Sequence, residues 1–202
     1  MVCIVDFSMG NLRSVQKAFE RIKIPAIISS NSEEILSSNK IVLPGVGNFE
    51  KGIYNLKFSG LFETLNEAVI VKGIPILGIC LGMQLMTEHS EEGNIQGFGW
   101  IKAKTIKLYT EKSMLKIPHM GWNNLFMKNK SELFSNINSE DLFYFAHSYF
   151  VKCEDPKNIL TETNYGFNFV SSFNKNNIYG CQFHPEKSHD IGLKVIKNFT
   201  EL

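Results

Sequence analysis

The stretch ILGICLGMQLM, residues 76–86, places a cysteine between two glycines where an apolar run gives way to a helical pattern. The apolar run predicts a buried strand, and the residues from Leu81 onward predict a helix. A Gly-x-Cys-x-Gly turn has the form of a nucleophile elbow, in which small neighbours leave room for the nucleophile. We therefore predict a reactive Cys80 above the carboxyl edge of a sheet, where a helix N-terminus favours its thiolate. The alternative is a buried cysteine beside glycines required for close packing.

Outward from this elbow, the first half of the chain alternates between strand and helix patterns. Apolar runs predict four strands, over residues 2–7, 26–30, 40–47 and 74–80. A helical stripe over residues 58–70 precedes the fourth strand, and continuous apolar strands joined by helices are typical of a parallel sheet covered on both faces. After about residue 98 short β-rich segments follow, before a final amphipathic helix. We predict a single α/β domain over residues 1–202, with a mostly parallel central sheet, flanking helices and a β-rich second half.

The composition excludes several classes of protein. The chain has 202 residues, 44% of them hydrophobic and 20% charged, which is ordinary for a soluble globular domain. Its formal net charge is +1, without a basic block, so a nucleic-acid-binding role is not expected. No basic leader precedes the first apolar run and no run reaches 18 apolar residues, which argues against a signal peptide and a membrane span. Four scattered cysteines indicate reduced thiols in the cytoplasm rather than a metal site.

A base for the cysteine is supplied by QFHPEKS, residues 182–188. His184 and Glu186 lie two residues apart at the predicted end of a strand, so both side chains can face the same side. Glu186 can then orient the imidazole while His184 takes the thiol proton. The alternative is a surface turn. The other four histidines are weaker candidates for a base, because they lack this pairing or are expected at solvated positions: His89, His119, His147 and His189.

The glycine turn LPGVGNF, residues 43–49, follows the third predicted strand. Its backbone amides can point at an oxyanion together with the amide of Leu81. A phosphate-binding loop is not supported, because the stretch lacks the Gly-Lys-Ser/Thr ending of a Walker motif and the third glycine of GxGxxG. A plain strand-ending turn remains the alternative. No HExxH or clustered cysteine pattern occurs, so no metal site is predicted.

Together these motifs resemble those of a known family. DFSMGNLRSV, LPGVGNF, GICLGMQLM, PHMGWN, HSYF and QFHPEKS occur in that order along nearly the whole chain. In this the chain resembles the class I (triad) glutamine amidotransferases, and most closely the glutaminase subunits of imidazole glycerol phosphate synthases. One departure is Phe7-Ser8, where the family more often has tyrosine and glycine. This departure leaves the candidate triad untouched.

The resemblance implies a reaction without a cofactor. Cys80 would attack the side-chain amide of L-glutamine, His184 would carry the proton to the departing ammonia, and Glu186 would orient His184. Val46 or Gly47, together with Leu81, would supply the oxyanion amides. The family likeness also predicts four residues that line the glutamine pocket: Gln84, Glu92, Ser148 and Tyr149. The alternatives are an exposed helix position for the first, a solvated acid for the second and strand packing for the last two.

The resemblance also implies a partner. The chain leaves no room for an ammonia-consuming synthase domain, so we expect the acceptor on a separate polypeptide. In the resembled family this is a cyclase subunit of the (β/α)8-barrel type, which forms a heterodimer with the glutaminase and raises its activity. Asn11, Trp122 and Lys187 match family positions at that interface. The alternatives are a core position for Trp122 and an unremarkable surface charge for Lys187.

Three other functions remain open at this point. Paralogous glutaminases feed ammonia to sugar-amidating enzymes of surface-polysaccharide synthesis. A cysteine peptidase-like hydrolase of the same fold would use the same Cys-His pair, although Gln84 and the HSY stretch argue against it. A non-catalytic binding subunit is opposed by the intact set of Cys80, His184 and Glu186.

Overall fold

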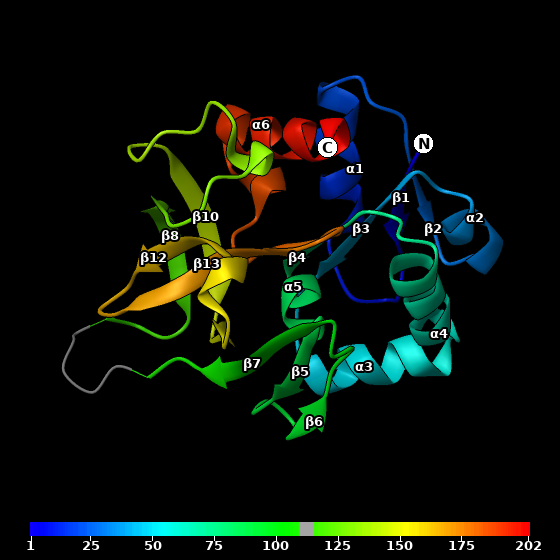
Figure 1. The fold of residues 1–202 in the computed structure, drawn as a ribbon, viewed down its shortest axis with the longest axis horizontal. Helices are drawn as coiled ribbons and strands as arrows, with labels where there is room; N and C mark the ends of the chain where they lie inside the picture. The colour runs from blue at the N-terminus through cyan, green and yellow to red at the C-terminus, as the bar shows by residue number, and fades with distance from the viewer. Residues whose placement is uncertain (110–114) are drawn as a thin grey trace.

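The structure is a computed structural model that describes residues 1–109 and 115–202. Its centre is a large twisted sheet, drawn edge-on in Figure 1, whose main strand order is β2-β1-β3-β4-β14-β13-β11-β7-β5-β6. The first five strands of this order are parallel: β2 (Ala26–Ser29), β1 (Val2–Val5), β3 (Lys40–Gly45), β4 (Ile76–Cys80) and β14 (Ile178–Cys181). The prediction of a parallel sheet at the centre of the fold is confirmed, and each of the four predicted strands is present.

Helices cover both faces of the parallel strands. On one face lie α1 (Leu12–Arg21) and α6 (His189–Glu201), and on the other lie α3 (Phe49–Phe58) and α4 (Leu61–Asn66) (Figure 1). Successive strand residues point to opposite faces, so Ile4 packs in the cluster of α1 and α6, while Cys3 and Val5 pack in that of α3 and α4. Two short elements complete this half of the fold: α2 (Ser32–Leu36) and the π-helical turn η1 (Glu67–Val71).

The predicted helix over residues 58–70 is wrong in its start. Phe58 is the last residue of α3, which begins nine residues earlier at Phe49, after the N-cap Asn48, whose Oδ1 accepts a hydrogen bond from the Lys51 amide at 2.9 Å. Gly60 then adopts a left-handed conformation, with φ of +75°, which ends α3 before α4 begins at Leu61. Phe58 is 82% exposed and does not join the apolar stripe of α4. The apolar spacing therefore ran across two helices that the glycine separates.

The second half is β-rich, as predicted. Antiparallel strands extend the central sheet: β13 (Asn168–Lys175), β11 (Tyr149–Cys153), β7 (Ile101–Lys107), β6 (Ile95–Gln96), β12 (Ile159–Asn164) and β9 (Phe126–Met127). The strand β5 (Thr87–Ser90) pairs parallel with β7, and a separate antiparallel pair consists of β8 (His119–Asn124) and β10 (Leu142–His147). Short helical turns are α5 (Leu81–Leu85), η2 (Glu132–Phe134), η3 (Pro156–Asn158) and η4 (Pro185–Lys187).

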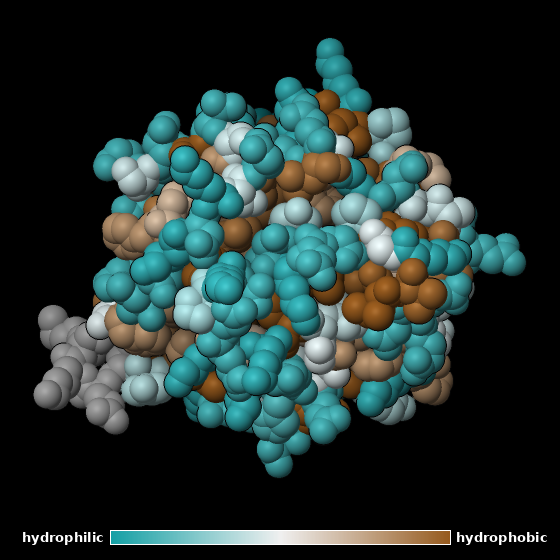
Figure 2. Space-filling view, in the orientation of Figure 1, coloured by the Kyte–Doolittle hydropathy of each residue, from teal (hydrophilic) through white to brown (hydrophobic). Residues whose placement is uncertain are grey.

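The face of the molecule in Figure 2 is mostly hydrophilic and is interrupted by small apolar patches. Among the described residues, no helix combines the length and the apolar character that crossing a membrane requires.

Ser8 occupies a backbone conformation that favours glycine, with φ of +62°, at a position where the resembled family more often has glycine. In this left-handed conformation, a residue with a side chain costs about 1–2 kcal/mol relative to glycine. The greater conformational entropy that glycine has in the unfolded chain offsets roughly half of that cost. We expect Ser8→Gly to raise the free energy of unfolding by about 0.5 kcal/mol in urea denaturation. Ser8→Ala keeps a Cβ and should bring no gain, and a Ser8→Gly variant no more stable than Ser8→Ala would contradict this reading.

Candidate active site

Cys80 stands at the turn between β4 and α5. It is the last residue of the strand and the N-cap of the helix, and its backbone has φ of +53° and ψ of −106°. Such a conformation is rare for a residue with a side chain and is typical of a nucleophile elbow. A Cβ on Gly78 would lie 2.7 Å from the backbone of Gly82 and Met83. Glycine is therefore required beside Cys80 for the helix to approach the strand.

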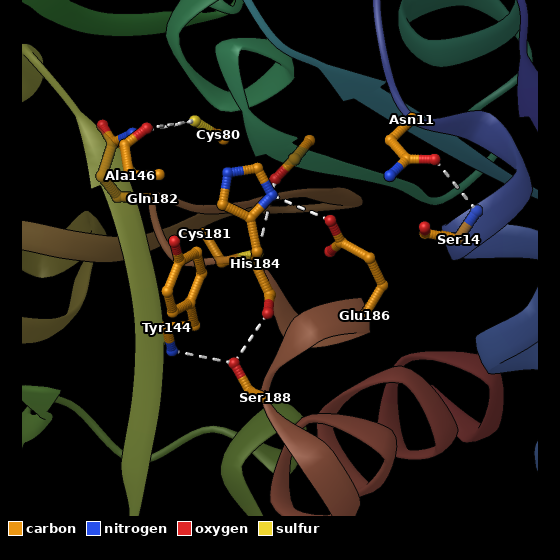
Figure 3. A network of polar contacts seen from close by, with 11 residues as sticks. Asn11, Ser14, Cys80, Tyr144, Ala146, Cys181, Gln182, His184, Glu186 and Ser188 are labelled. Carbon is orange, nitrogen blue, oxygen red and sulfur yellow. Dashed lines mark hydrogen bonds and ion pairs between the residues drawn. The ribbon is translucent and has the colours of Figure 1, made fainter. Parts of the chain in front are cut away.

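His184 lies between Cys80 and Glu186 (Figure 3). Its Nδ1 is 2.8 Å from Oε1 of Glu186, and the two side chains are 2% and 3% exposed. The segment after β14 is held in place because the His184 amide donates to the Tyr144 carbonyl at 2.8 Å and Ser188 Oγ donates to the His184 carbonyl at 2.6 Å. The predicted cysteine, from the first half of the chain, and the predicted histidine and glutamate, near its carboxyl end, are thus brought together.

Charges in the site determine the protonation of His184. Burial by itself lowers the pKa of His184, but the Cys80 sulfur and the Glu186 carboxylate raise it further than burial lowers it, to about 10. An imidazole that keeps its proton at neutral pH beside a sulfur is suited to stabilising a thiolate and to delivering a proton to a departing group. The glutamate has the orienting position that a triad requires.

A cavity of about 250 Å³ opens beside Cys80. This is below the roughly 300–1,000 Å³ of sites for drug-sized ligands and suits a small molecule. The cavity is lined by every residue predicted for the oxyanion turn or the glutamine pocket: Val46, Gly47, Leu81, Gln84, Glu92, Ser148 and Tyr149. Met120 and His147, which the sequence did not suggest for the pocket, also line it.

Two of these lining residues also hold the walls of the cavity. Gln84 is only 4% exposed, so it does not have the exposed helix position considered as its alternative, and its Nε2 donates to the Tyr149 carbonyl at 2.8 Å. Oε2 of Glu92 accepts the amide of Phe49 at 2.7 Å, at the start of α3. Glu92 therefore anchors the end of the glycine turn, in which Gly47 has φ of +109°.

The residues predicted for a partner interface lie near the triad. Trp122 is 44% exposed, which excludes the core position considered for it, and its ring lies 5.7 Å from that of Tyr144. The ammonium of Lys187 lies 5.8 Å from the centre of the same Tyr144 ring. Asn11 caps α1 by accepting the Ser14 amide at 3.4 Å and appears beyond Glu186 in Figure 3.

Two buried histidines form a pair on β8 and β10 that sequence analysis missed. Nδ1 of His119 is 3.0 Å from Nε2 of His147, whose Nδ1 is 2.9 Å from the Tyr149 carbonyl. Burial, and then the neighbouring His119, lower the pKa of His147 to about 3, and burial lowers the pKa of His119 to about 4. Both rings are therefore neutral near pH 7, consistent with a hydrogen-bonded role behind the pocket wall.

This pair should make the protein sensitive to acid. An unfolded histidine titrates near pH 6.5, above the folded pKa of either ring, so the unfolded chain binds more protons as the pH falls. Stability is then complete above about pH 6.5 and is lost toward pH 4. We expect each ring to lower the free energy of unfolding by on the order of 2 kcal/mol from pH 7 to pH 5, so that the fall is about half as large in His147→Gln. Urea denaturation at both pH values measures this, with His89→Gln as the control, and an unchanged fall in His147→Gln would refute it.

Tyr144 and Gln182 were also missed. A signal for Gln182 was present in the sequence, because Gln182, His184 and Glu186 alternate and alternate residues of an extended chain face one side. Tyr144 has no local signal, since it meets Trp122 and Lys187 only through the β8–β10 pairing and the position of η4.

Comparison with known proteins gives full-length matches. The family model for glutamine amidotransferase class-I matches residues 3–201. The chain is 48% identical to imidazole glycerol phosphate synthase subunit HisH 2 of Methanococcus maripaludis, over 100% of this chain and 99% of that protein. It is 48% identical to subunit HisH of Methanocaldococcus jannaschii and 45% identical to subunit HisH 1 of Campylobacter jejuni, with complete coverage on both sides.

Solved structures share the fold. A crystal structure of a glutamine amidotransferase superposes with a TM-score of 0.77 at 16% identity, covering 100% of this chain and 98% of that one. The PurLQS structure from Thermotoga maritima gives a TM-score of 0.71 at 18% identity, covering 99% and 97%. At these identities the likeness concerns the fold alone, whereas the family model and the full-length relatives concern the sequence itself. The chain belongs to the class I glutamine amidotransferases, in the family of the imidazole glycerol phosphate synthase subunit HisH.

Proposed function

We propose that this chain is the glutaminase subunit of an imidazole glycerol phosphate synthase, acting in histidine biosynthesis in the cytoplasm. It hydrolyses L-glutamine to glutamate and ammonia and passes the ammonia to a cyclase subunit. The observation that carries this proposal is the buried Cys80, His184 and Glu186 set beside a small cavity, in a chain whose full-length relatives have HisH names.

The chemistry proceeds in two halves. The Cys80 thiolate adds to the side-chain amide carbon of glutamine, and the oxyanion is held by backbone amides of Leu81 and of Val46 or Gly47. His184 gives its proton to the nitrogen, the C–N bond breaks, and ammonia leaves a glutamyl thioester on Cys80. His184 then takes a proton from water, whose oxygen adds to the thioester carbon, and glutamate leaves as the sulfur departs. Glu186 holds the imidazole in one orientation throughout.

For the partner we propose a cyclase of the (β/α)8-barrel type. Trp122 and Lys187 meet at Tyr144, close to His184, and Asn11 lies on the side of Glu186. A partner seated on these side chains would lie within a short distance of the released ammonia. The names of the reported relatives do not favour a sugar-amidating or peptidase-like role.

The test is reconstitution. The chain is co-purified with a candidate barrel cyclase, and formation of imidazole glycerol phosphate is measured with glutamine as the nitrogen source. We expect the complex to use glutamine and to hydrolyse it faster than the isolated chain does. Labelling by a glutamine-analogue electrophile, mapped by mass spectrometry, should modify Cys80. A complex that forms product with ammonium but never with glutamine would sink the proposal.

A further inference from the structure

Two buried glutamines lie behind Cys80. Gln182, directly after β14, is fully buried, and its Nε2 donates to the Cys80 sulfur at 3.6 Å (Figure 3). Its Oε1 accepts from Nε2 of Gln84 at 3.0 Å. Burying an amide costs free energy unless the amide is hydrogen-bonded. An amide that contacts a reacting atom is also placed to take part in the reaction. The reaction described above leaves Gln182 without one.

The orientation of both amides follows from their partners. A backbone carbonyl only accepts, so Gln84 must turn its NH2 group toward the Tyr149 carbonyl, 2.8 Å away. The second hydrogen of that NH2 group then points at Gln182, whose Oε1 must be the acceptor. Gln182 is left with its NH2 group toward the sulfur. The reverse orientation would set like groups against each other at two places.

The anchoring carbonyl is itself held from the other side. His147 donates its Nδ1–H to the Tyr149 carbonyl at 2.9 Å, so its Nε2 accepts from Nδ1 of His119 at 3.0 Å. Because both rings remain neutral near pH 7, this order of donors is not disturbed by protonation. The orientation of the amide at the sulfur therefore depends on a continuous buried network that begins on β8.

The groups around the sulfur favour different protonation states. The Ala146 carbonyl, 3.9 Å away, can accept only from a thiol S–H and so favours the neutral form. The Gln182 N–H can bond a thiolate and gains strength when the sulfur is charged. Its neutral amide does so without competing with His184 for the proton.

We propose that Gln182 is a further catalytic residue, whose oriented amide N–H stabilises the Cys80 thiolate, with Gln84 as its positioning residue. For turnover this rests on the proposed glutaminase function. The bond strengthens when the sulfur is the attacking thiolate and again when the thioester collapses and the sulfur leaves. In the thioester the charge is gone and the contact is weak.

The test compares alkylation of Cys80 by iodoacetamide as a function of pH in the wild type and in Gln182→Met, which has no donor at this position. We expect the pH of half-maximal rate to rise by about one pH unit, and kcat for glutamine in the reconstituted complex to fall about tenfold with little change in KM. Gln84→Met leaves the donor of Gln182 in place but unanchored, so its pH profile should move less.

The design separates a chemical from a structural role. Gln16→Met removes another partly buried glutamine, which donates to Ala26, and should leave the profile in place. Burial raises the pKa of Cys3 to about 11 and that of Cys153 to about 12, so these thiols should react slowly near neutral pH. Peptide mapping assigns the alkylation to Cys80, and Cys80→Ala gives the background rate. If Gln182→Met folds poorly, Gln182→Asn is the substitute, because its side chain is one methylene shorter. The pH of half-maximal alkylation rate should rise in this variant as well.

Two failures are distinguishable. A Gln182→Met or Gln182→Asn profile that superposes on the wild type, or equal shifts in Gln182→Met and Gln84→Met, would overturn the role of Gln182 while wild-type glutaminase activity stands. A wild-type complex that never uses glutamine would overturn the proposed function, and the alkylation profiles would still decide the role of Gln182.

Discussion

Cys80→Ala should abolish glutamine-dependent synthesis, lowering kcat for glutamine hydrolysis by about 10⁴-fold or more, because removal of a nucleophile leaves only binding and oxyanion stabilisation. The residue lines the cavity beside His184 and Gln182, and it is the one thiol among the described residues that do so. The measurement is glutamate release from glutamine by the reconstituted complex, with thermal unfolding as the check on folding.

Two controls make this result specific. Ammonium supplied in place of glutamine should restore product formation by the complex that contains Cys80→Ala, since the partner's reaction needs only ammonia. Cys153→Ala removes a thiol on β11 outside the cavity and should keep glutamine-dependent activity. Glutamine turnover by Cys80→Ala at the wild-type rate would mean that another residue is the nucleophile.

Gly82→Ala should be among the most destabilising single-methyl changes in this chain, at about 3–5 kcal/mol. A Cβ on Gly82 would overlap the carbonyl oxygen of Leu43 in β3, and that backbone atom cannot move without disturbing the pairing of β3 with β4. Alanine ordinarily favours a helix over glycine by about 1 kcal/mol, so the steric clash outweighs the helix preference. Urea denaturation gives the change in free energy.

Gly73→Ala is the matched control. At Gly73 φ is +69° and nothing lies within 4 Å of an added Cβ, so its expected cost of about 1 kcal/mol comes from backbone conformation alone. Any Gly82→Ala protein that folds should also lose activity, because a shift of α5 moves Cys80 and Leu81 with it. If Gly82→Ala proves no more costly than Gly73→Ala, the close packing of α5 on β3 is not what the elbow requires.

Local patterns predicted those parts of the fold and site that depend on local chemistry. The Gly-x-Cys-x-Gly turn needs only the residues next to Cys80, and the pairing of His184 with Glu186 needs only their spacing of two. Four of the five strands of the parallel half were predicted because a strand covered on both faces is a continuous apolar run. The helix over residues 58–70 failed because apolar spacing does not reveal the left-handed turn at Gly60.

The rest depends on contacts between distant segments. His119 meets His147 because β8 and β10 pair in one register, with those two residues opposite each other. Gln182 meets Gln84 because β14 lies beside β4 in the sheet, which places the end of one strand next to the helix that follows the other. A shift of one residue in either pairing would turn these side chains to the opposite face.

The sequence by itself therefore predicted a nucleophile, its base and orienter and an oxyanion turn, and it identified the family, since each lies in a short segment with its own chemical signature. Only the tertiary structure decided which way the donors behind Cys80 point, because their orientation depends on one backbone carbonyl, that of Tyr149, shared by Gln84 and His147. The cysteine stands between glycines because the backbone of α5 packs closely on β3 at Gly82 and on β4 at Gly78. Its electrostatic surroundings depend on the backbone carbonyl of Ala146 and the side chain of Gln182, 66 and 102 residues further along the chain, which only folding brings to the sulfur.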